Sequence, residues 1–327
     1  MIICRTPMRI SLLGGGTDIP SYYEKFGGEV ISLAIRKYTY ITIHSKYGDG
    51  LRISYSKTEN VDNLSQIEHP LIKSVLMESQ ETSSLEITSI AEVPSKGTGL
   101  GSSSSFTVGL LNALAHFSDT PQSKHRLAES AWQIESKTSS VGVGKQDQYA
   151  VAYGGFNRFE FTKSGEVVIK SFNLDLEFQK TLLDSIFLVD TGLSRQASKL
   201  LTSQLEEMKL SERSTSARHA IKSSVELGAK VLREGDLQGF AEILNETWRQ
   251  KQLFGNVSND EIVELYEYGL ASGAIGGKLL GAGGGGFFMF VVPEKHWNAF
   301  AQCMEFRNKR VLNVELDYEG TSVVYKS

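Results

Sequence analysis

Glycine is concentrated in four short segments of this 327-residue chain, which holds 31 glycines and only 6 prolines. Residues 14–28, 97–101, 142–155 and 269–286 together contain 21 of the 31 glycines. Collagen, proline-rich disorder and glycine–serine linkers are excluded, because each needs its bias spread along the chain. Glycine adopts backbone angles that other residues avoid and lets a second backbone come close. The clusters therefore predict a few special loops in an otherwise ordinary folded chain.

The overall composition is that of a globular protein, with 40% hydrophobic and 22% charged residues. The length indicates about two domains. A net charge of −4 gives no basic field for nucleic acid or an anionic membrane. Two cysteines, Cys4 and Cys303, cannot make a disulfide framework and favour a reducing compartment. With neither a signal-peptide pattern nor a membrane-length apolar run, we expect a cytoplasmic protein with small-molecule partners.

Strand and helix patterns are mixed in both halves of the chain. In the first half, segments rich in β-branched and aromatic residues predict strands at 30–44, 51–56 and 85–93. Apolar residues at helical spacing predict helices over 71–76, over 106–117 and after Pro121, with Leu127, Ala131 and Ile134 on one face of the last.

The second half is dominated by helical patterns, at 195–208, 211–234, 236–254 and 260–271. A strand over 286–292 and a short helix over 294–306 follow, and the partner strand lies at either 311–316 or 322–325. Since βαβ units do not alternate regularly, the pattern predicts a two-domain α+β fold. We place the domains at 1–172, with a glycine- and serine-rich phosphate loop, and at 173–327.

The most informative segment is 94–105, Pro-Ser-Lys-Gly-Thr-Gly-Leu-Gly-Ser-Ser-Ser-Ser. It follows a predicted strand and opens a predicted helix, so its N–H groups converge at a helix N-terminus that favours phosphate. An ordinary glycine-rich turn with serine caps is the alternative, but three alternate glycines and four serines suit it poorly. The predicted nucleotide-binding residues are Lys96, Gly97, Gly99, Leu100, Gly101, Ser102, Ser103 and Ser104.

A second glycine run, 281–286, formally matches the dinucleotide-binding pattern G-x-G-x-x-G. That motif must be followed by a helix, whereas Phe-Phe-Met-Phe-Val-Val at 287–292 is a strand pattern. A Walker loop is also excluded, because Gly-Lys at 144–145 and 277–278 is not followed by Ser or Thr. The run predicts close backbone packing against another loop or a ligand, or else a packing turn without a ligand.

Segments 7–18, 94–105 and 278–286 resemble, in order and spacing, the three motifs of the GHMP kinases, the superfamily of galactokinase, homoserine kinase, mevalonate kinase and phosphomevalonate kinase. Gly-Gly-Gly-Thr-Asp at 14–18, Gly-Gly at 27–28 and Asp-Thr-Gly-Leu-Ser-Arg at 190–195 look most like the members acting on D-glycero-D-manno-heptose 7-phosphate. Galactokinases instead carry Gly-Glu-His-Thr-Asp. Met8 and Leu280 also depart from the usual glycine and threonine of the family.

The resemblance implies an N-terminal domain like ribosomal protein S5 domain 2, a ferredoxin-like C-terminal domain and an active site between them. It implies an ATP- and Mg²⁺-dependent phosphotransferase acting on an alcohol. The expected reaction converts D-glycero-α-D-manno-heptose 7-phosphate to the 1,7-bisphosphate, for nucleotide-activated heptose in capsule, lipopolysaccharide or S-layer glycans. A kinase for free fucose, galactose or heptose is the alternative, as is a non-catalytic sugar and nucleotide sensor on the same fold.

The resemblance also assigns catalytic roles to Asp147, which would accept or orient the sugar hydroxyl proton, and to Arg9, near the transferred phosphate. The competing interpretations are a helix N-cap for Asp147 and an exposed strand arginine for Arg9. Glu135 would bind Mg²⁺ together with Ser102 or Ser103. Its alternative is a solvated glutamate that pairs with Lys137.

Sugar binding is expected at two places in the chain. Gly15, Gly16, Thr17 and Asp18 match the sugar-side turn, although Asp18 also suits an Asx turn. Asp190 is expected to contact the sugar, and Arg195, with Lys199 one turn later, to hold a sugar phosphate. The six histidines have no metal-ligand spacing.

Overall fold

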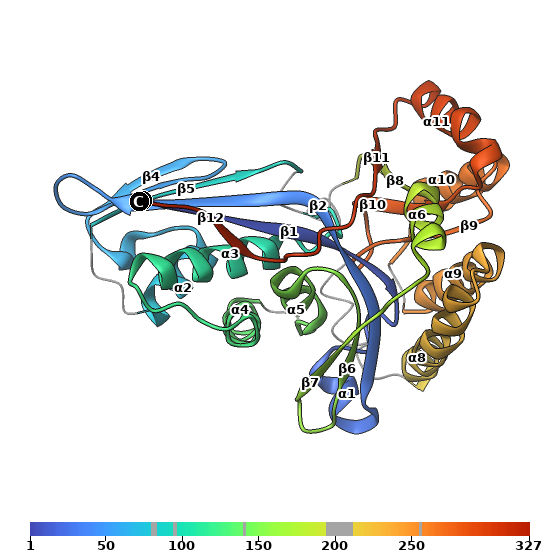
Figure 1. Cartoon of the computed structure of the whole chain (residues 1–327), viewed down its shortest axis with the longest axis horizontal. Coiled ribbons are helices and arrows are strands. Elements are labelled where there is room, and N and C mark those ends of the chain that lie inside the picture. The colour runs from blue at the N-terminus through green and yellow to red at the C-terminus, as the bar shows by residue number, and fades with distance from the viewer. Residues whose placement is uncertain (80–83, 94–96, 140–141, 194–211, 255–256) are drawn as a thin grey trace.

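Two β-sheets organise the chain into two lobes (Figure 1). The computed structural model describes residues 1–327 except 80–83, 94–96, 140–141, 194–211 and 255–256. The larger sheet has the strand order β12-β1-β2-β5-β3-β4, and β6 and β7 branch from β2. Its strands are β1 (Ile2–Leu13), β2 (Gly28–Ser45), β3 (Leu51–Ser54), β4 (Thr58–Val61), β5 (Leu85–Ala91), β6 (Phe156–Phe161), β7 (Val167–Ser171) and β12 (Ser322–Lys326).

The long strand β2 ties the two ends of this sheet together. Its first half pairs with β6 and its second half with β5, while β1 pairs along nearly its whole length. Alternation of buried residues such as Ile41 and Ile43 explains why this segment forms a strand with a covered face. Because β1 and β2 continue to the second lobe, both strands carry residues to the boundary between the lobes (Figure 1).

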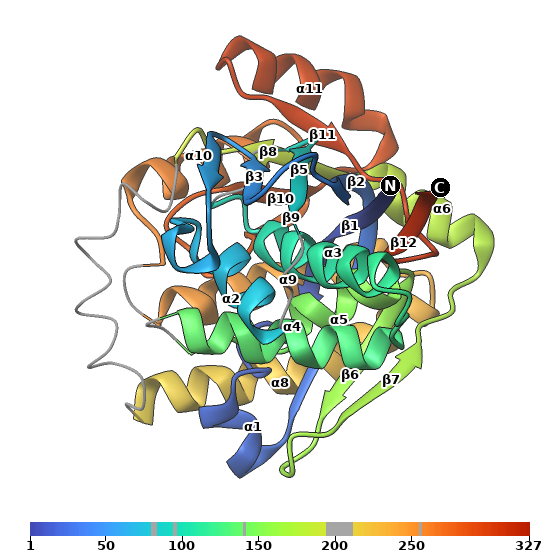
Figure 2. The same ribbon diagram turned by 90° about the vertical axis from the view of Figure 1, so that its left-hand side faces the viewer.

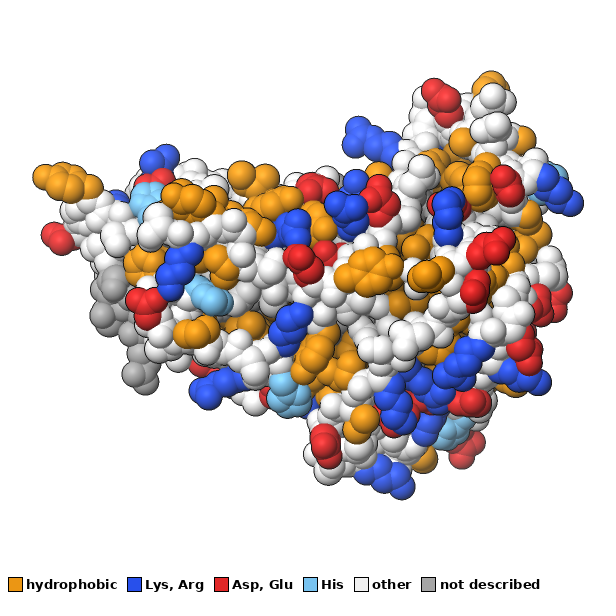
Figure 3. Space-filling model, in the orientation of Figure 1, with side chains coloured by type: hydrophobic (Ala, Val, Ile, Leu, Met, Phe, Trp, Pro, Cys, Tyr) orange, Lys and Arg blue, Asp and Glu red, His pale blue; other side chains and the backbone are white. Residues whose placement is uncertain are grey.

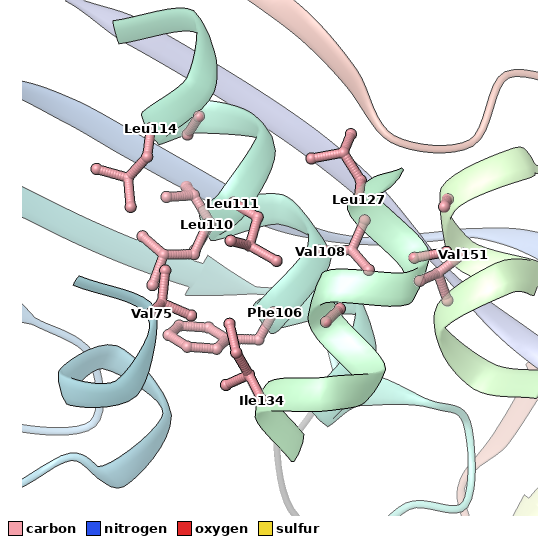
Figure 4. Close-up of a cluster of buried hydrophobic side chains, with 14 of the residues drawn as sticks. Val75, Phe106, Val108, Leu110, Leu111, Leu114, Leu127, Ile134 and Val151 are labelled. Carbon is pink, nitrogen blue, oxygen red and sulfur yellow. The ribbon is translucent and has the colours of Figure 1, made fainter. Parts of the chain in front are cut away.

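Four helices cover one face of the larger sheet: α2 (Pro70–Glu78), α3 (Ser102–Phe117), α4 (Lys124–Thr138) and α5 (Gln146–Tyr153). Figure 2 shows α3 against β1, with α4 and α5 beyond it. In Figure 4, Phe106 of α3 lies between Val75 and Ile134, and Leu110 and Leu114 belong to the same buried cluster. The predicted apolar faces of α3 and α4 are thereby confirmed. Two shorter helices, α1 (Pro20–Phe26) and η1 (Leu64–Gln66), follow β1 and β4 along the chain.

The second sheet has four antiparallel strands in the order β11-β8-β10-β9. They are β8 (Ile186–Asp190), β9 (Gly276–Leu279), β10 (Phe287–Val291) and β11 (Val311–Asn313), and the helices of this lobe are α6 (Leu176–Ser185), α8 (Glu212–Arg233), α9 (Leu237–Gln252), α10 (Asp260–Ala271), η2 (Glu294–His296) and α11 (Trp297–Phe306). Along the chain, helices follow the first and the third of these strands, β8 and β10, as in a ferredoxin-like unit. The expected C-terminal fold is confirmed.

Successive side chains of β10 point to opposite faces of this sheet, and helices cover both faces. Phe287 and Met289 lie in a cluster with Phe240 of α9, whereas Phe288 lies with Phe300 of α11. Continuous burial of Phe287–Val291 accounts for the uninterrupted apolar run in the sequence.

The last strand of the chain does not lie in the lobe that the predicted division into 1–172 and 173–327 would give it. Of the two predicted candidates, 311–316 supplies β11 of the second sheet, while β12 (Ser322–Lys326) pairs with β1 of the first. The boundary at 172/173 stays a prediction, but the C-terminal strand returns to the first lobe. The predicted helix over 195–208 lies outside the described residues. The sequence analysis did not predict strands β4, β6, β7, β8 and β9 or helices α1 and α6.

The surface carries charges of both signs. On the face drawn in Figure 3, acidic and basic side chains are interspersed, and basic ones gather where Figure 1 draws α8. Among the helices of the described residues, none combines the length and apolarity that crossing a membrane would need. Cys4 and Cys303 are free thiols, and burial raises the pKa of Cys4 to about 12.

Candidate active site

Arg9 links the phosphate loop to the predicted catalytic aspartate. Its Nε and Nη2 donate to the two carboxylate oxygens of Asp147 at 2.8 and 2.7 Å, and its Nη1 donates to the Gly99 carbonyl at 2.5 Å. Arg9 lies on β1 and is only 3% exposed, so the interpretation as an exposed strand arginine is wrong. Asp147 lies inside the first turn of α5 after Lys145, so it is not the N-cap.

The phosphate loop has the backbone that its glycines predict. Gly97, Gly99 and Gly101 have φ of 76°, 75° and 71°, in the left-handed region that other residues avoid. Gly101 directly precedes α3 and has no side chain to cap the first N–H groups of that helix. A Cβ on Gly101 would lie 3.0 Å from Arg9 Cγ. The loop therefore presents a helix N-terminus beside a fixed guanidinium, a setting that suits an anion.

The glycine run at 281–286 packs against this loop. A Cβ on Gly99 would lie 2.7 Å from the Leu280 carbonyl oxygen, and one on Gly281 would lie 2.5 Å from Gly99 Cα. The Phe287 N–H also donates to the Thr98 carbonyl at 2.9 Å. The prediction of close backbone packing is confirmed, and the packing partner is the phosphate loop.

Glu135 of α4 is buried among polar groups beside the start of α3. Its Oε2 accepts hydrogen bonds from Ser104 Oγ at 3.0 Å and Gln148 Nε2 at 2.9 Å, while its buried Oε1 has no partner among the described residues. Burial raises the pKa of Glu135 to about 7. Lys137 pairs instead with Glu78, so the interpretation of Glu135 as a solvated partner of Lys137 is wrong.

The serine that contacts Glu135 is not one of the two expected to share a metal ion with it. Ser104, predicted to bind nucleotide, is the serine that contacts Glu135, whereas Ser102 Oγ lies 3.3 Å from Thr98 Oγ1. Ser103 is exposed. Over the described part of the chain, no group of three or more His, Cys, Asp or Glu residues could hold a metal ion. A cation here would therefore depend on Glu135, hydroxyl groups, water and ligand phosphates.

Asp18 is brought next to the helix that carries Asp147. Its Oδ1 accepts from the Gly16 N–H at 3.0 Å and its Oδ2 from the Gln146 N–H at 3.2 Å, so it does not form the alternative Asx turn. Burial raises the pKa of Asp18, and the charge of Asp147 raises it further. A Cβ on Gly144 would lie 1.9 Å from Asp18 Oδ2, which explains the glycine there.

The other predicted sugar-binding residues have no described contact with Asp147. Thr17 Oγ1 lies 2.8 and 2.9 Å from the carbonyl oxygens of Gly14 and Glu29, so this hydroxyl fastens the turn. Gly15 abuts Ser11 of β1. Asp190, at the end of β8, accepts from the Gly192 N–H at 2.9 Å, and no described contact joins it to Asp18 or Asp147. Arg195, Lys199 and Lys96 lie outside the described residues.

Three residues that the sequence analysis did not select complete the site. Gln146 and Gln148 flank Asp147, and they bond Asp18 and Glu135 respectively. The signal was the polar run Gln-Asp-Gln at the start of a helix. Lys278 of β9 is buried, and its Nζ donates to the Leu12 carbonyl at 2.8 Å. Burial, aided by the charge of Arg9, lowers the pKa of Lys278 to about 7.

Comparison with known families gives two matches along the chain. The model described as the GHMP kinases N terminal domain matches residues 70–155, and the GHMP kinases C terminal model matches residues 229–307. A curated relative, D-glycero-alpha-D-manno-heptose 7-phosphate kinase of Campylobacter jejuni, is 33% identical over 90% of each chain.

Solved structures show the same architecture. A D-glycero-D-manno-heptose 1-phosphate kinase from Bacteroides thetaiotaomicron superposes with a TM-score of 0.81 over 100% of both chains, at 26% identity. Lactococcus lactis galactokinase complexed with galactose covers 98% of this chain and 94% of its own, with a TM-score of 0.74 and 18% identity. The second likeness shows the fold alone.

Proposed function

This chain belongs to the GHMP kinase family, and we propose that it transfers the γ-phosphate of ATP to the anomeric hydroxyl of D-glycero-α-D-manno-heptose 7-phosphate. The product is the 1,7-bisphosphate, a precursor of nucleotide-activated heptose. In this reaction Gly97–Ser104 bind the ATP phosphates, and Gly16 and Asp18 bind the sugar.

The observation that carries the proposal is the position of Arg9 between two groups. One guanidinium donates both to Gly99 of the phosphate loop and to both oxygens of Asp147. Phosphoryl transfer needs positive charge at the transferred group and a carboxylate that orients the attacking hydroxyl. Arg9 supports both requirements, because it brings the loop and Asp147 together and holds the carboxylate in one orientation. Asp147 is still 27% exposed, which leaves room for a hydroxyl to donate to it.

The donor set beside the phosphate loop fits Mg²⁺. Among the described residues, the buried Oε1 of Glu135 has no hydrogen-bond partner, and the hydroxyls of Ser104 and of the preceding serines lie at the same helix end. Such oxygen donors, together with ATP phosphates and water, are the ligands that a hard cation prefers. When bound, Mg²⁺ would neutralise charge on the phosphates. Gln148 holds Glu135 in place through its second oxygen.

The choice of sugar rests on the relatives. The curated Campylobacter jejuni relative acts on heptose 7-phosphate, and the Bacteroides structure is named as a heptose 1-phosphate kinase. Both names describe a heptose that carries a phosphate. The identity of 33% over nine-tenths of each chain supports the 7-phosphate as substrate.

A coupled assay of ATP consumption over a panel of sugars tests the proposal. The panel contains heptose 7-phosphate, heptose 1-phosphate, and free heptose, fucose and galactose. We expect the highest kcat/KM with heptose 7-phosphate. Turnover of free sugars alone would favour the alternative of a free-sugar kinase, and no turnover on any member would favour a sensor.

Asp147→Asn is the variant that tests the assigned mechanism. We expect kcat to fall about 10²- to 10⁴-fold with little change in KM for ATP, because the amide cannot accept the hydroxyl proton. Asp184→Asn, at an exposed aspartate of α6 that pairs with Lys180, serves as the matched control and should keep full activity. A D147N enzyme with wild-type kcat would remove Asp147 from the reaction.

A further inference from the structure

Arg218 of α8 is a half-buried arginine without an acidic partner in the described part of the chain. Its guanidinium stacks over the Phe254 ring, with Cζ 4.7 Å from the ring centroid, and its Nη1 contacts the Ser214 carbonyl at 3.4 Å. Its Nε is buried and has no hydrogen-bond partner among the described residues. Burial lowers the pKa of Arg218, which means that the surroundings oppose its charge.

This arginine lies at the sugar side of the active site. Phe254, on which it stacks, reaches to 3.8 Å from the point where a Cβ on Gly16 would stand. The neighbouring His219 contacts the hydroxyl of Tyr22 through Nδ1 at 2.8 Å, so α8 meets α1 just beyond the turn that holds Asp18. Arg218 is therefore next to the loop predicted to bind the sugar.

Printed contacts give an order along the site. Asp18 accepts a hydrogen bond from the N–H of Gln146, the residue before Asp147, and another from the N–H of Gly16. Gly16 in turn lies next to Phe254, over which Arg218 lies. Asp18 thus lies between the carboxylate that faces the reacting hydroxyl and the guanidinium. A sugar with its anomeric hydroxyl at Asp147 and its ring at Asp18 would extend its far end toward Arg218.

We propose that Arg218 binds the phosphate that the sugar substrate already carries, and so makes the site specific for a phosphorylated sugar. The inference rests on the proposed function. A guanidinium that lies over an aromatic ring and whose Nε has no partner among the described residues suits a phosphate dianion, which accepts two parallel hydrogen bonds from such a fork. Binding the anion would also compensate a charge that is otherwise buried without a partner.

Other described cations near this turn are engaged elsewhere. Arg9 is held by Asp147, Lys222 Nζ donates to the Phe26 carbonyl at 2.6 Å, and Lys145 forms an ion pair with Glu129 at 2.9 Å. Arg158 contacts Glu29 and Glu226. Each of these side chains already contacts a carboxylate or a carbonyl at hydrogen-bond distance, whereas Arg218 has no carboxylate partner among the described residues and only one long contact, to the Ser214 carbonyl.

The test compares Arg218→Gln with Arg233→Gln. Arg233 lies on the same helix and stacks on Phe172 at 4.9 Å, but it is exposed and outside the site, so it controls for loss of an arginine–aromatic contact. For R218Q we expect KM for heptose 7-phosphate to rise roughly 10- to 100-fold, KM for ATP and kcat/KM for free heptose to stay unchanged, and R233Q to match wild type. Arg218→Lys should recover part of the loss, since it restores charge without the planar fork.

A binding measurement gives a second readout that does not depend on turnover. Calorimetric titration of heptose 7-phosphate, without ATP, should show the same weakening for R218Q and none for R233Q. An R218Q enzyme with wild-type affinity for the sugar phosphate would overturn the assignment, as would an equal loss toward free heptose and ATP. If wild type itself turns over only free sugars, the proposed function fails; if wild type prefers the sugar phosphate and R218Q does too, only the role of Arg218 fails.

Discussion

Single side chains in this site are fixed by partners that lie far away in the sequence. Glu135 is held by Ser104 from α3 and by Gln148 from α5, and Asp18 is held by Gln146, 128 residues later. Helix α5 therefore carries Asp147 together with the two glutamines that orient the other carboxylates. This arrangement makes the first turn of α5 the point at which Asp18, Glu135 and Arg9 meet.

Glu135→Gln should make the metal-free protein more stable at alkaline pH while abolishing most of its activity. The carboxyl has a folded-state pKa of about 7 against 4.5 ordinarily, so the native state binds the proton more tightly than the unfolded state. Ionising the buried carboxyl therefore lowers the free energy of unfolding. This loss is absent below about pH 4.5, grows as pH rises, and is complete above pH 7. It amounts to on the order of 3 kcal/mol for this buried group.

Urea unfolding with a chelator present, at pH 5.5 and pH 8, measures this effect. We expect wild type to lose stability relative to E135Q between the two pH values. Glu78→Gln is the control at an exposed glutamate near the same helices and should show no such divergence. If the free energies of unfolding of wild type and E135Q changed in parallel with pH, the buried Glu135 carboxylate would not be destabilising the protein.

At the scale of elements, two glycine loops from different lobes form one structure. Gly99 and Gly281 approach so closely that neither has room for a Cβ, and both have positive φ. The glycine run at 281–286 thus supports the phosphate loop from behind with backbone atoms. The geometry of the N–H groups in the first loop therefore depends on the second lobe being in place.

Gly281→Ala should destabilise the protein more than an alanine at a comparable but open glycine. Gly48 has φ +83° and no atom within 4 Å of the point where a Cβ would stand, so Gly48→Ala should cost only about 1–2 kcal/mol for the left-handed backbone. Gly281→Ala adds a clash with Gly99 Cα, worth roughly a further 1–3 kcal/mol. Urea unfolding measures both, and KM for ATP should rise only in G281A. Equal effects of the two variants would contradict the supporting role.

At the scale of the whole molecule, the two lobes are joined through buried polar contacts as well as apolar packing. Lys278 of β9 donates to Leu12 of β1, and β12 carries the C-terminus back to pair with β1. Met8, Ile10 and Leu12 of β1 lie in one apolar cluster with residues of α8 and α9. Strand β1 is therefore common to the first sheet, the second lobe and, through Arg9, the active site.

Lys278→Met should change how stability depends on pH. The lysine has a folded-state pKa of about 7 against 10.5 ordinarily, so the native state releases the proton more readily than the unfolded state. The buried lysine therefore lowers the free energy of unfolding, fully below pH 7 and progressively less as pH rises toward 10.5. Between pH 7 and 9, the free energy of unfolding of wild type should rise by on the order of 2 kcal/mol relative to that of K278M. Thermal unfolding across that range measures it. Lys230→Met, at an exposed lysine of α8, is the control, and identical pH profiles for wild type and K278M would refute the prediction.

Features that depend on local backbone conformation and on the spacing of apolar residues could be predicted from the sequence. Three alternate glycines before a helix allow the positive φ that the loop adopts, and apolar spacing predicted α3, α4 and β2. Three contacts could be seen only once the chain is folded: Ser104 with Glu135, buried Arg9 with Asp147, and Arg218 over the ring of Phe254. Such contacts join segments separated by tens to hundreds of residues, and their partners are chosen by how the elements pack, which no local pattern records.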